Sequence, residues 1–269
     1  SWQREHADRL PYLRACWQAA GLHGTYGAMR LAIDCLQDAT AIAPQGRDEC
    51  DQSAWCHYML SRTQVLLGDT AAAARTIRAA RRLAHGSHDQ RLLGLIETWL
   101  ATVLCSRKPL QPAIALMERV IRDSRRQGRT DQLAGQYNVL ASCLTTRGDY
   151  PSAAVAVGES LDCALGSNNP QALLWALVCA AEADIFRGQL ERAETSLREI
   201  EMLRGVGYSF ESEFHIALMS FYIAYERCDF EATLAPLAQA RALCRADMAS
   251  RTILVDILHD FVCVETWRF

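Results

Sequence analysis

Apolar residues recur at intervals of three and four through most of the chain, and short polar breaks separate the apolar segments. This spacing places the apolar side chains on one face of an α-helix. No segment alternates apolar and polar residues between turns, as a half-buried β-strand would. The pattern predicts an all-α protein of about thirteen helices. Longer irregular stretches are expected at residues 43–51, 85–88 and 205–209.

The polar breaks follow a period of 40 residues. Four similar segments begin at Leu67, Arg147, Arg187 and Arg227, and Arg107 begins a fifth at the position between the first two. The second residue of these five segments is, in order, Gly68, Lys108, Gly148, Gly188 and Cys228. A glycine at this position permits the left-handed conformation that commonly ends a helix. Each 40-residue repeat is therefore predicted to be a pair of helices joined by a tight turn.

Small and bulky residues also repeat in fixed columns. Seven residues before the turn position are Ser61, Ala101, Ala141, Ala181 and, as an exception, Phe221. Five residues after it are Ala73, Ala113, Ala153, Ala193 and then Thr233, and nine after it are Ile77, Met117, Val157, Leu197 and Leu237. Small residues at these columns would let the two helices of a pair approach closely.

The periodicity predicts one domain, residues 1–269, folded as a right-handed α-solenoid of about six helix-turn-helix repeats and a final helix. The expected repeats are residues 3–41, 52–85, 90–127, 131–165, 170–204 and 209–246, with the final helix at 250–268. The exposed face of that final helix is a candidate for self-association. The chain begins without Met and stops inside a helix-like pattern, so we expect it to be a piece of a longer protein.

These columns resemble the tetratricopeptide repeat (TPR). In that family a small residue lies midway in the first helix, a Gly-Asn/Asp-aromatic turn follows, and an alanine comes five residues after the glycine. Ala141, Gly148-Asp149-Tyr150 and Ala153 match this pattern. The period of 40 exceeds the usual length of about 34. It resembles the long-repeat superhelical arms of large bacterial ATP-dependent transcription activators of the LuxR and maltose-activator type.

The resemblance implies a function for the chain. In those activators the arm follows an NTPase module, binds the inducer and precedes a DNA-binding helix-turn-helix. It also implies that the first helices line a concave groove, whose inward columns hold Trp55, Tyr58, Arg62, Thr98, Thr102, Asn138, Ser142, Trp175, Glu182, His215 and Tyr222. This mixture of aromatic and hydrogen-bonding groups suits a protein, a peptide or a small polar inducer. The alternative is that several of them, above all Trp55 and Trp175, pack in the core.

Other candidate chemistry is weak. The chain has no phosphate-binding loop, dinucleotide fingerprint, zinc-protease motif or nucleophile elbow. His85 and His88, and Cys50 and Cys56 with His57, lack the further ligands that a metal site needs. The carboxylate pair Glu182/Asp184, like Glu211/Glu213, has no nucleophile nearby and fits solvent-facing or groove-lining charge. We therefore expect no catalytic residue, no metal and no cofactor.

Composition narrows the setting. The net charge is -3, and two arginine clusters, 78/81/82 and 122/125/126, fit a solvated outer face, so we expect no direct contact with nucleic acid. The longest apolar run, 172–181, is too short for a bilayer, and no secretory signal is visible. Lys108 is the only lysine, and together with the alanine-rich sequence this favours a GC-rich, bacterial genome. Eleven scattered cysteines without a C-x-x-C pair fit a reducing cytoplasm.

Two functional hypotheses follow from these features. The first is a non-catalytic sensor and protein-interaction arm of a bacterial transcription regulator. The second is a free-standing adaptor that joins proteins. The tripeptide Arg147-Gly148-Asp149 also matches a cell-adhesion signal, but Gly148 occupies the common turn position, so a structural role is predicted for it.

Overall fold

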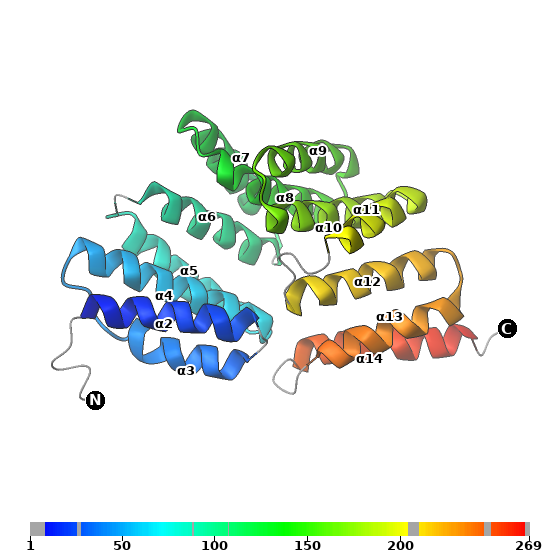
Figure 1. Cartoon of the computed structure of the whole chain (residues 1–269), viewed down its shortest axis with the longest axis horizontal. Coiled ribbons are helices and arrows are strands. Elements are labelled where there is room, and N and C mark those ends of the chain that lie inside the picture. Colours follow the sequence, from blue (N-terminus) through cyan, green and yellow to red (C-terminus); the bar gives the residue numbers. More distant parts are fainter. Residues whose placement is uncertain are drawn as a thin grey trace. The chain divides into compact units, whose positions relative to one another are not determined.

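A computed structural model describes residues 9–25, 28–87, 89–106, 108–203, 210–244 and 249–266. Thirteen α-helices and no strand occur within these ranges, which confirms the predicted all-α class (Figure 1). The chain divides into two compact units, residues 1–120 and 121–269, and each is considered by itself.

Unit 1 is built from helical hairpins. Its helices are α2 (Arg9–Thr25), α3 (Met29–Thr40), α4 (Arg47–Leu66), α5 (Thr70–Ala84), α6 (Gln90–Cys105) and most of α7 (Gln111–Arg126). The first helices α2, α4 and α6 pack in a row, and α3 and α5 pack on their hairpin partners. Helix α4 begins before the predicted residue 52, because Asp48 and Glu49 in its first turn complement the helix dipole.

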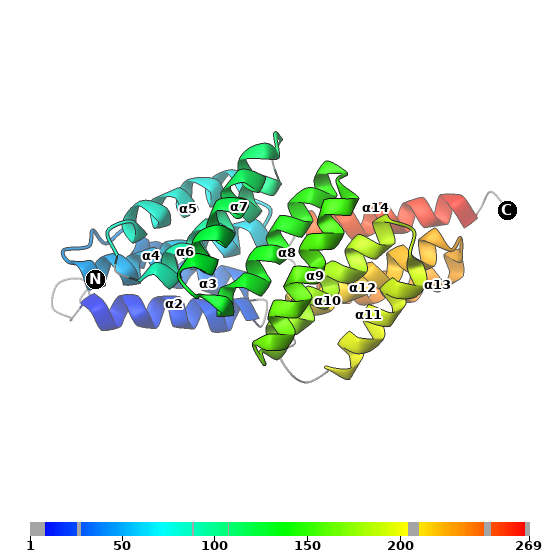
Figure 2. The ribbon, with the colours of Figure 1, turned by 90° about the horizontal axis from the view of Figure 1, so that it is seen from above.

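Unit 2 continues the same plan. Its helices are α8 (Thr130–Arg147), α9 (Tyr150–Gly166), α10 (Pro170–Phe186), α11 (Leu190–Met202), α12 (Phe210–Glu226), α13 (Phe230–Leu243) and α14 (Ala249–Thr266). The first helices α8, α10 and α12 again pack in a row, which we call the first-helix face. Figure 2 shows α8 to α11 side by side. The expected irregular stretch at 205–209 lies outside the described residues.

The turn positions have the predicted left-handed backbone. Four of the five turn positions in the 40-residue register hold a residue with positive φ: Gly68 (85°), Gly148 (84°), Gly188 (69°) and Cys228 (57°). Lys108 is the exception, and the Lys108–Pro109 peptide bond is cis. Left-handed residues also lie between hairpins, at Gly128 (65°) and Asn168 (49°). The structural period of the turns is thus half the 40-residue period seen in the sequence.

At three of these turns an aspartate occupies the N-cap position just before the next helix. Asp69, Asp149 and Asp229 accept hydrogen bonds from the backbone N–H three residues later, at 2.8, 3.3 and 3.1 Å. Such N-caps satisfy a backbone donor that has no partner within the helix. The Arg147 guanidinium also binds Asp149 at 2.6 Å and holds the pKa of that carboxyl below its usual value. The charged groups of the adhesion-like tripeptide therefore serve the turn.

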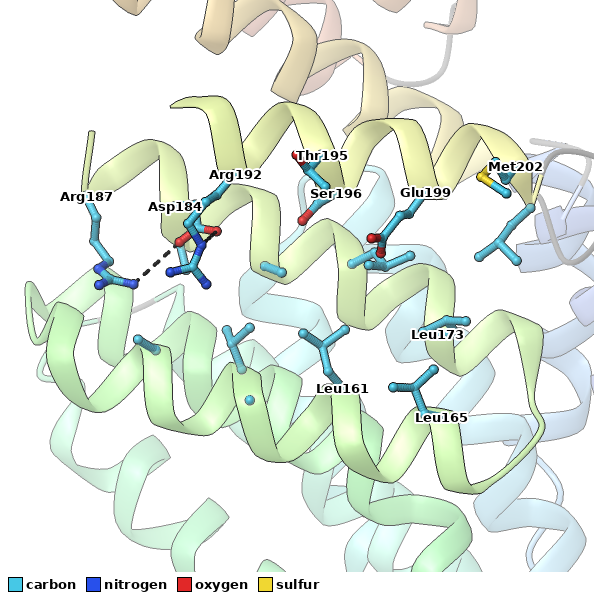
Figure 3. Close-up of a pocket in the computed structure, with 17 residues that line it drawn as sticks. Leu161, Leu165, Leu173, Asp184, Arg187, Arg192, Thr195, Ser196, Glu199 and Met202 are labelled. Atoms are coloured by element: carbon cyan, nitrogen blue, oxygen red, sulfur yellow. Dashed lines mark hydrogen bonds and ion pairs between the residues drawn. The ribbon is translucent and has the colours of Figure 1, made fainter. Parts of the chain in front are cut away.

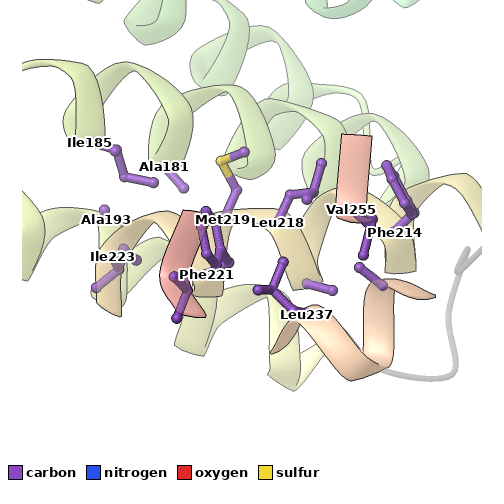
Figure 4. Packing of buried hydrophobic residues seen from close by; sticks show 13 residues of the cluster. Ala181, Ile185, Ala193, Phe214, Leu218, Met219, Phe221, Ile223, Leu237 and Val255 are labelled. Carbon is purple, nitrogen blue, oxygen red and sulfur yellow. The ribbon is translucent and has the colours of Figure 1, made fainter. Parts of the chain in front are cut away.

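The repeated columns form the core of each hairpin. Ser61, Ala101, Ala141 and Ala181 are at most 2% exposed, and Ala73, Ala113, Ala153 and Ala193 are fully buried. In the α4–α5 hairpin the Ser61 hydroxyl donates to the Ala73 carbonyl at 3.0 Å. In the α12–α13 hairpin Phe221 occupies the small-residue column, and it lies within the buried cluster of α10 to α14 (Figure 4).

Helix α14 joins that cluster through Val255 and Val262, which are 1% and 0% exposed. Leu254 and Ile257 on the same helix are exposed. Self-association through this face remains a prediction. Among the described residues, no helix combines the length and the apolar character that a membrane crossing requires.

Replacing Gly148 with valine should lower the free energy of unfolding by about 1–2 kcal/mol, because a branched side chain is strained at positive φ. An added Cβ would meet no atom within 4 Å, so the loss isolates backbone strain. The control is Gly135→Ala in the middle of α8, where the added methyl also meets nothing. That change should stabilise the protein, and urea denaturation followed by circular dichroism measures both. Equal behaviour of the two variants would contradict the assigned turn.

Candidate functional site

The predicted inward residues of unit 1 form a chain of aromatic contacts. Trp55 of α4 stacks on Trp17 of α2 with ring centroids 5.0 Å apart, and its ring meets the edge of Tyr58 at 5.6 Å. Tyr58 in turn contacts Trp99 of α6 at 6.4 Å. All four rings are partly buried. Trp17 and Trp99 were missed in the sequence because neither occupies a repeating column.

The polar residues of the unit 1 set also make contacts within the protein. The Arg62 guanidinium lies 5.9 Å from the Tyr58 ring centre and 5.6 Å from that of Trp99, within the range of a cation–π contact. Thr98 and Thr102 donate to backbone carbonyls one turn earlier in their own helix, at 2.7 and 3.2 Å. The unit 1 residues therefore form a partly buried aromatic and cationic stripe in which most groups already have partners.

The predicted residues of unit 2 come together on α10 and α12. Trp175 meets the His215 ring edge-on with centroids 5.5 Å apart. Glu182 and Tyr222 each lie seven residues, or about two helical turns, beyond Trp175 and His215 on the same helices. Burial raises the pKa of the Tyr222 phenol, and the nearby Glu182 carboxylate raises it further. Glu182 acts likewise on the Cys179 thiol, whose pKa is raised first by its burial. These five side chains are called the Glu182 site.

Glu182 is the unusual member of the Glu182 site. It keeps partial solvent exposure, yet burial raises the pKa of its carboxyl. No cationic side chain among the described residues forms an ion pair with it. A carboxylate without a partner in such surroundings is costly to keep ionised. A cationic group arriving from outside would relieve that cost.

Asn138 and Ser142 of α8 do not join the Glu182 site. Asn138 is 8% exposed, and its side-chain oxygen accepts a 2.6 Å hydrogen bond from Ser160 of α9. That bond ties the two helices of the hairpin together. Ser142 is partly exposed, and its backbone carbonyl accepts from Thr146.

The raised pKa of Glu182 predicts a pH dependence of stability. As the pH rises above the ordinary value of 4.5, the unfolded chain ionises freely while the folded carboxyl resists, so the free energy of unfolding falls until the folded pKa is passed. Glu182→Gln removes this contribution. The variant should therefore gain stability relative to the wild type as the pH rises through that window. Urea denaturation at several pH values measures the difference, and a constant difference would contradict the assignment.

The cysteine and histidine residues considered as metal ligands make other contacts in the structure. The Cys56 thiol donates to the Leu13 carbonyl at 3.3 Å, and burial raises its pKa to about 12. The His57 ring contacts the Ser53 carbonyl at 2.8 Å, and burial lowers its pKa. His88 lies outside the described residues. Within the described part of the chain, no three His, Cys, Asp or Glu side chains gather as a metal site would require.

A pocket of about 580 Å³ lies elsewhere in unit 2, among α9, α10 and α11. Figure 3 shows Leu161 and Leu165 on one side, Leu173 on the floor, and Ser196 and Glu199 on the opposite side. Its volume falls in the range of about 300–1,000 Å³ typical of ligand pockets. The sequence columns did not predict it, because its wall is formed by second helices. We call it the α9–α11 groove.

One end of the α9–α11 groove is charged. Asp184, whose side chain is 8% exposed, contacts the guanidinium groups of Arg187 and Arg192 at 3.4 and 3.5 Å (Figure 3). Burial raises the pKa of Asp184, and the two arginines partly offset that rise. Glu182 and Asp184, paired in the sequence, therefore serve different surfaces.

Comparison with known proteins supports the helical-repeat architecture. A family model described as anaphase-promoting complex subunit 5 matches residues 2–61 and 53–107. No curated protein matches the chain. Among solved structures, the apo form of RapI has a TM-score of 0.71 at 9% identity, and the match covers 90% of this chain and 86% of that one.

Two further structures extend the likeness. A Rap protein complexed with competence and sporulation factor has a TM-score of 0.68 at 13% identity, covering 99% of this chain and 76% of its own. The TPR-like repeats of a putative kinesin light chain from Podosopora anserina have a TM-score of 0.54 at 16% identity, covering 74% and 97%. At these identities the likeness shows the fold alone. The chain therefore has the fold of TPR-like helical-repeat proteins.

Proposed function

We propose that this chain is a non-catalytic sensor and protein-interaction arm of a bacterial, cytoplasmic transcription regulator. It binds a protein or peptide partner, or an inducer, on the first-helix face of unit 2. The observation that carries this proposal is the Glu182 site, where a partly exposed carboxyl without an ion-pair partner lies on the same face as three aromatic rings. A structural neighbour, a Rap protein, was solved in complex with competence and sporulation factor, which supports ligand or partner binding by a helical array of this kind.

The chemistry of the Glu182 site favours a ligand with a basic group. A lysine, an arginine or a small-molecule amine would pair with Glu182 and lower the pKa of its carboxyl again. The faces of Trp175 and Tyr222 can add area and cation–π attraction. Binding would bias the parent protein between its states to the extent that it favours one of them.

The test is a thermal-shift screen of lysine- and arginine-containing peptides and of amine metabolites. Ligands should raise the melting temperature of the wild type and of the control Glu226→Gln, which changes an exposed carboxylate at the end of α12. They should fail with Glu182→Lys, where affinity should fall about a hundredfold because an attractive pair becomes repulsive. Ligands that raise the melting temperatures of Glu182→Lys and Glu226→Gln equally would contradict the proposed site.

The adaptor hypothesis predicts a different outcome. A stoichiometric protein partner would then be recovered from the source cell, and no small molecule would shift the melting temperature. The regulator hypothesis has its own genetic test, because the full reading frame should encode a phosphate-binding loop upstream and a helix-turn-helix downstream. A reading frame that ends near Phe269 would contradict it.

A further inference from the structure

The α9–α11 groove can be compared with two earlier gaps between successive second helices, because the repeats share one register. Eighty residues before Leu161, Leu177 and Glu199 are Arg81, Glu97 and Arg119. In unit 1 these three form a bridge: both guanidiniums contact one Glu97 oxygen, at 3.0 and 2.9 Å. The bridge runs from α5 across α6 to α7.

The intermediate gap, between α7 and α9, is also bridged. Arg125 binds Glu159 at 2.6 Å, and its guanidinium lies 5.4 Å from the centre of the Tyr137 ring. In the α9–α11 groove the same register holds leucine at both bridging positions, 161 and 177. No ion pair among the described residues joins α9 to α11. The open groove is therefore the place where this repeated cross-link has been replaced by an apolar surface.

The groove combines that apolar surface with charges of opposite sign. At one end Arg187 and Arg192 share the single carboxylate of Asp184, which leaves an excess of one positive charge. Glu199 lies seven residues beyond Arg192 on α11, or about 10 Å along the helix at 1.5 Å per residue. Leu161 and Leu173 line the groove on the side facing α11, Leu177 is also part of its lining, and Leu165 and Met202, at the end away from Asp184, are 61% and 86% exposed (Figure 3).

We propose that the α9–α11 groove docks an amphipathic helix of a partner protein. The partner helix carries an acidic residue facing Arg192, apolar residues three and four positions later that cover the leucines, and a basic residue seven positions later that faces Glu199. This arrangement matches the two-turn spacing of the charges on α11. The partner thus supplies from outside the cross-link that Arg81 and Arg119 supply within unit 1.

The experiment uses two synthetic peptides of 14 residues that differ only in charge order. Each is an alanine-rich helix held by an outward-facing lactam bridge, with leucine at positions i+3 and i+4. One carries Asp at i and Arg at i+7, and the other reverses them. Fluorescence anisotropy with the 269-residue chain should show at least about tenfold tighter binding of the Asp-to-Arg peptide.

Variants of the protein then locate the site. Glu199→Arg should weaken binding of the Asp-to-Arg peptide about tenfold or more, and it should strengthen binding of a peptide with Asp at both positions. Glu191→Arg, an equal change of charge on an exposed residue of α11 outside the groove, should leave binding unchanged. Glu182→Lys should also have no effect, which separates this surface from the Glu182 site.

A variant designed to close the α9–α11 groove provides the second line of evidence. Leu161→Arg, Leu177→Glu and Glu199→Arg together copy the unit 1 bridge into the groove and should abolish binding of every peptide while circular dichroism remains unchanged. If the triple variant does not fold, the charge exchange at Glu199 decides the question. Binding that ignores charge order, responds equally at residues 191 and 199, or is absent at about 1 mM peptide would overturn the proposal.

Discussion

Replacing Phe221 with alanine is expected to lower the free energy of unfolding by about 3–5 kcal/mol, the largest effect of any single change considered for this protein. The Phe221 side chain is 2% exposed. Its ring stacks on Tyr225, with centroids 5.9 Å apart, and contacts Tyr222 edge-on at 5.2 Å. Truncation would leave a large cavity in the cluster that unites α10, α12, α13 and α14.

This expectation differs from what the column alone suggests, because the other repeats hold alanine or serine at the same position. Phe221 is nevertheless buried as fully as those small residues, so its ring is part of the packed core. The control is Phe221→Leu, which keeps most of the volume and should cost about 1–1.5 kcal/mol. Urea denaturation measures both, and a loss below about 1 kcal/mol for the alanine variant would show that the site can collapse.

The second large effect is expected at Glu97. Its side chain is 6% exposed and bridges Arg81 and Arg119, whose side chains are 36% and 41% exposed. Glu97→Ala removes the carboxylate from between two guanidiniums and leaves a cavity on α6. Breaking a fully buried pair costs about 3–5 kcal/mol. Water can reach both arginines here, so the expected loss of stability is about 2–3 kcal/mol.

The matched control for Glu97 comes from the chain itself. Leu177 is the corresponding residue two repeats later, and it is 4% exposed in an apolar setting. Glu97→Leu should therefore fill the cavity and lose about half as much stability as the alanine variant, since a hydrophobic replacement often offsets a lost buried ion pair. Thermal unfolding should show a shift of about 2–4 °C per kcal/mol for a protein of this size. Equal losses for the two variants would mean that the charge, and not the packing, dominates.

The turns show how much of the fold was predictable. Gly148 and Asp149 stand next to each other because one ends a helix with a left-handed backbone and the other begins the next with an N-cap. Both requirements are met within a few residues, so the sequence reveals them directly. The left-handed backbone at Asn168 and Gly128 was not predicted, since the columns followed one turn per 40 residues. Asn169 after the first caps the next helix, whereas Arg129 after the second makes no side-chain cap.

The candidate site was predictable only in part. In the structure the column residues Trp175 and His215 contact each other, and Glu182 lies close enough to Tyr222 to raise the pKa of that phenol, because residues at one position of successive repeats lie on adjacent first helices. The columns could not show that Asn138 is engaged by Ser160 within its own hairpin. Nor could they show that Trp17 and Trp99 extend the aromatic contacts of unit 1.

The helices, their turns and the faces they bury can be read from the chain, because caps, left-handed turns and apolar spacing are properties of neighbouring residues. Which charges meet across helices depends on how the helices pack. Arg81 and Arg119 reach Glu97 from 16 and 22 residues away, while the equivalent gap at Leu177 stays open. The same holds for Glu182, whose raised pKa depends on what neighbouring helices place around it. Long-range packing therefore set the chemistry of both surfaces where a partner is proposed to bind.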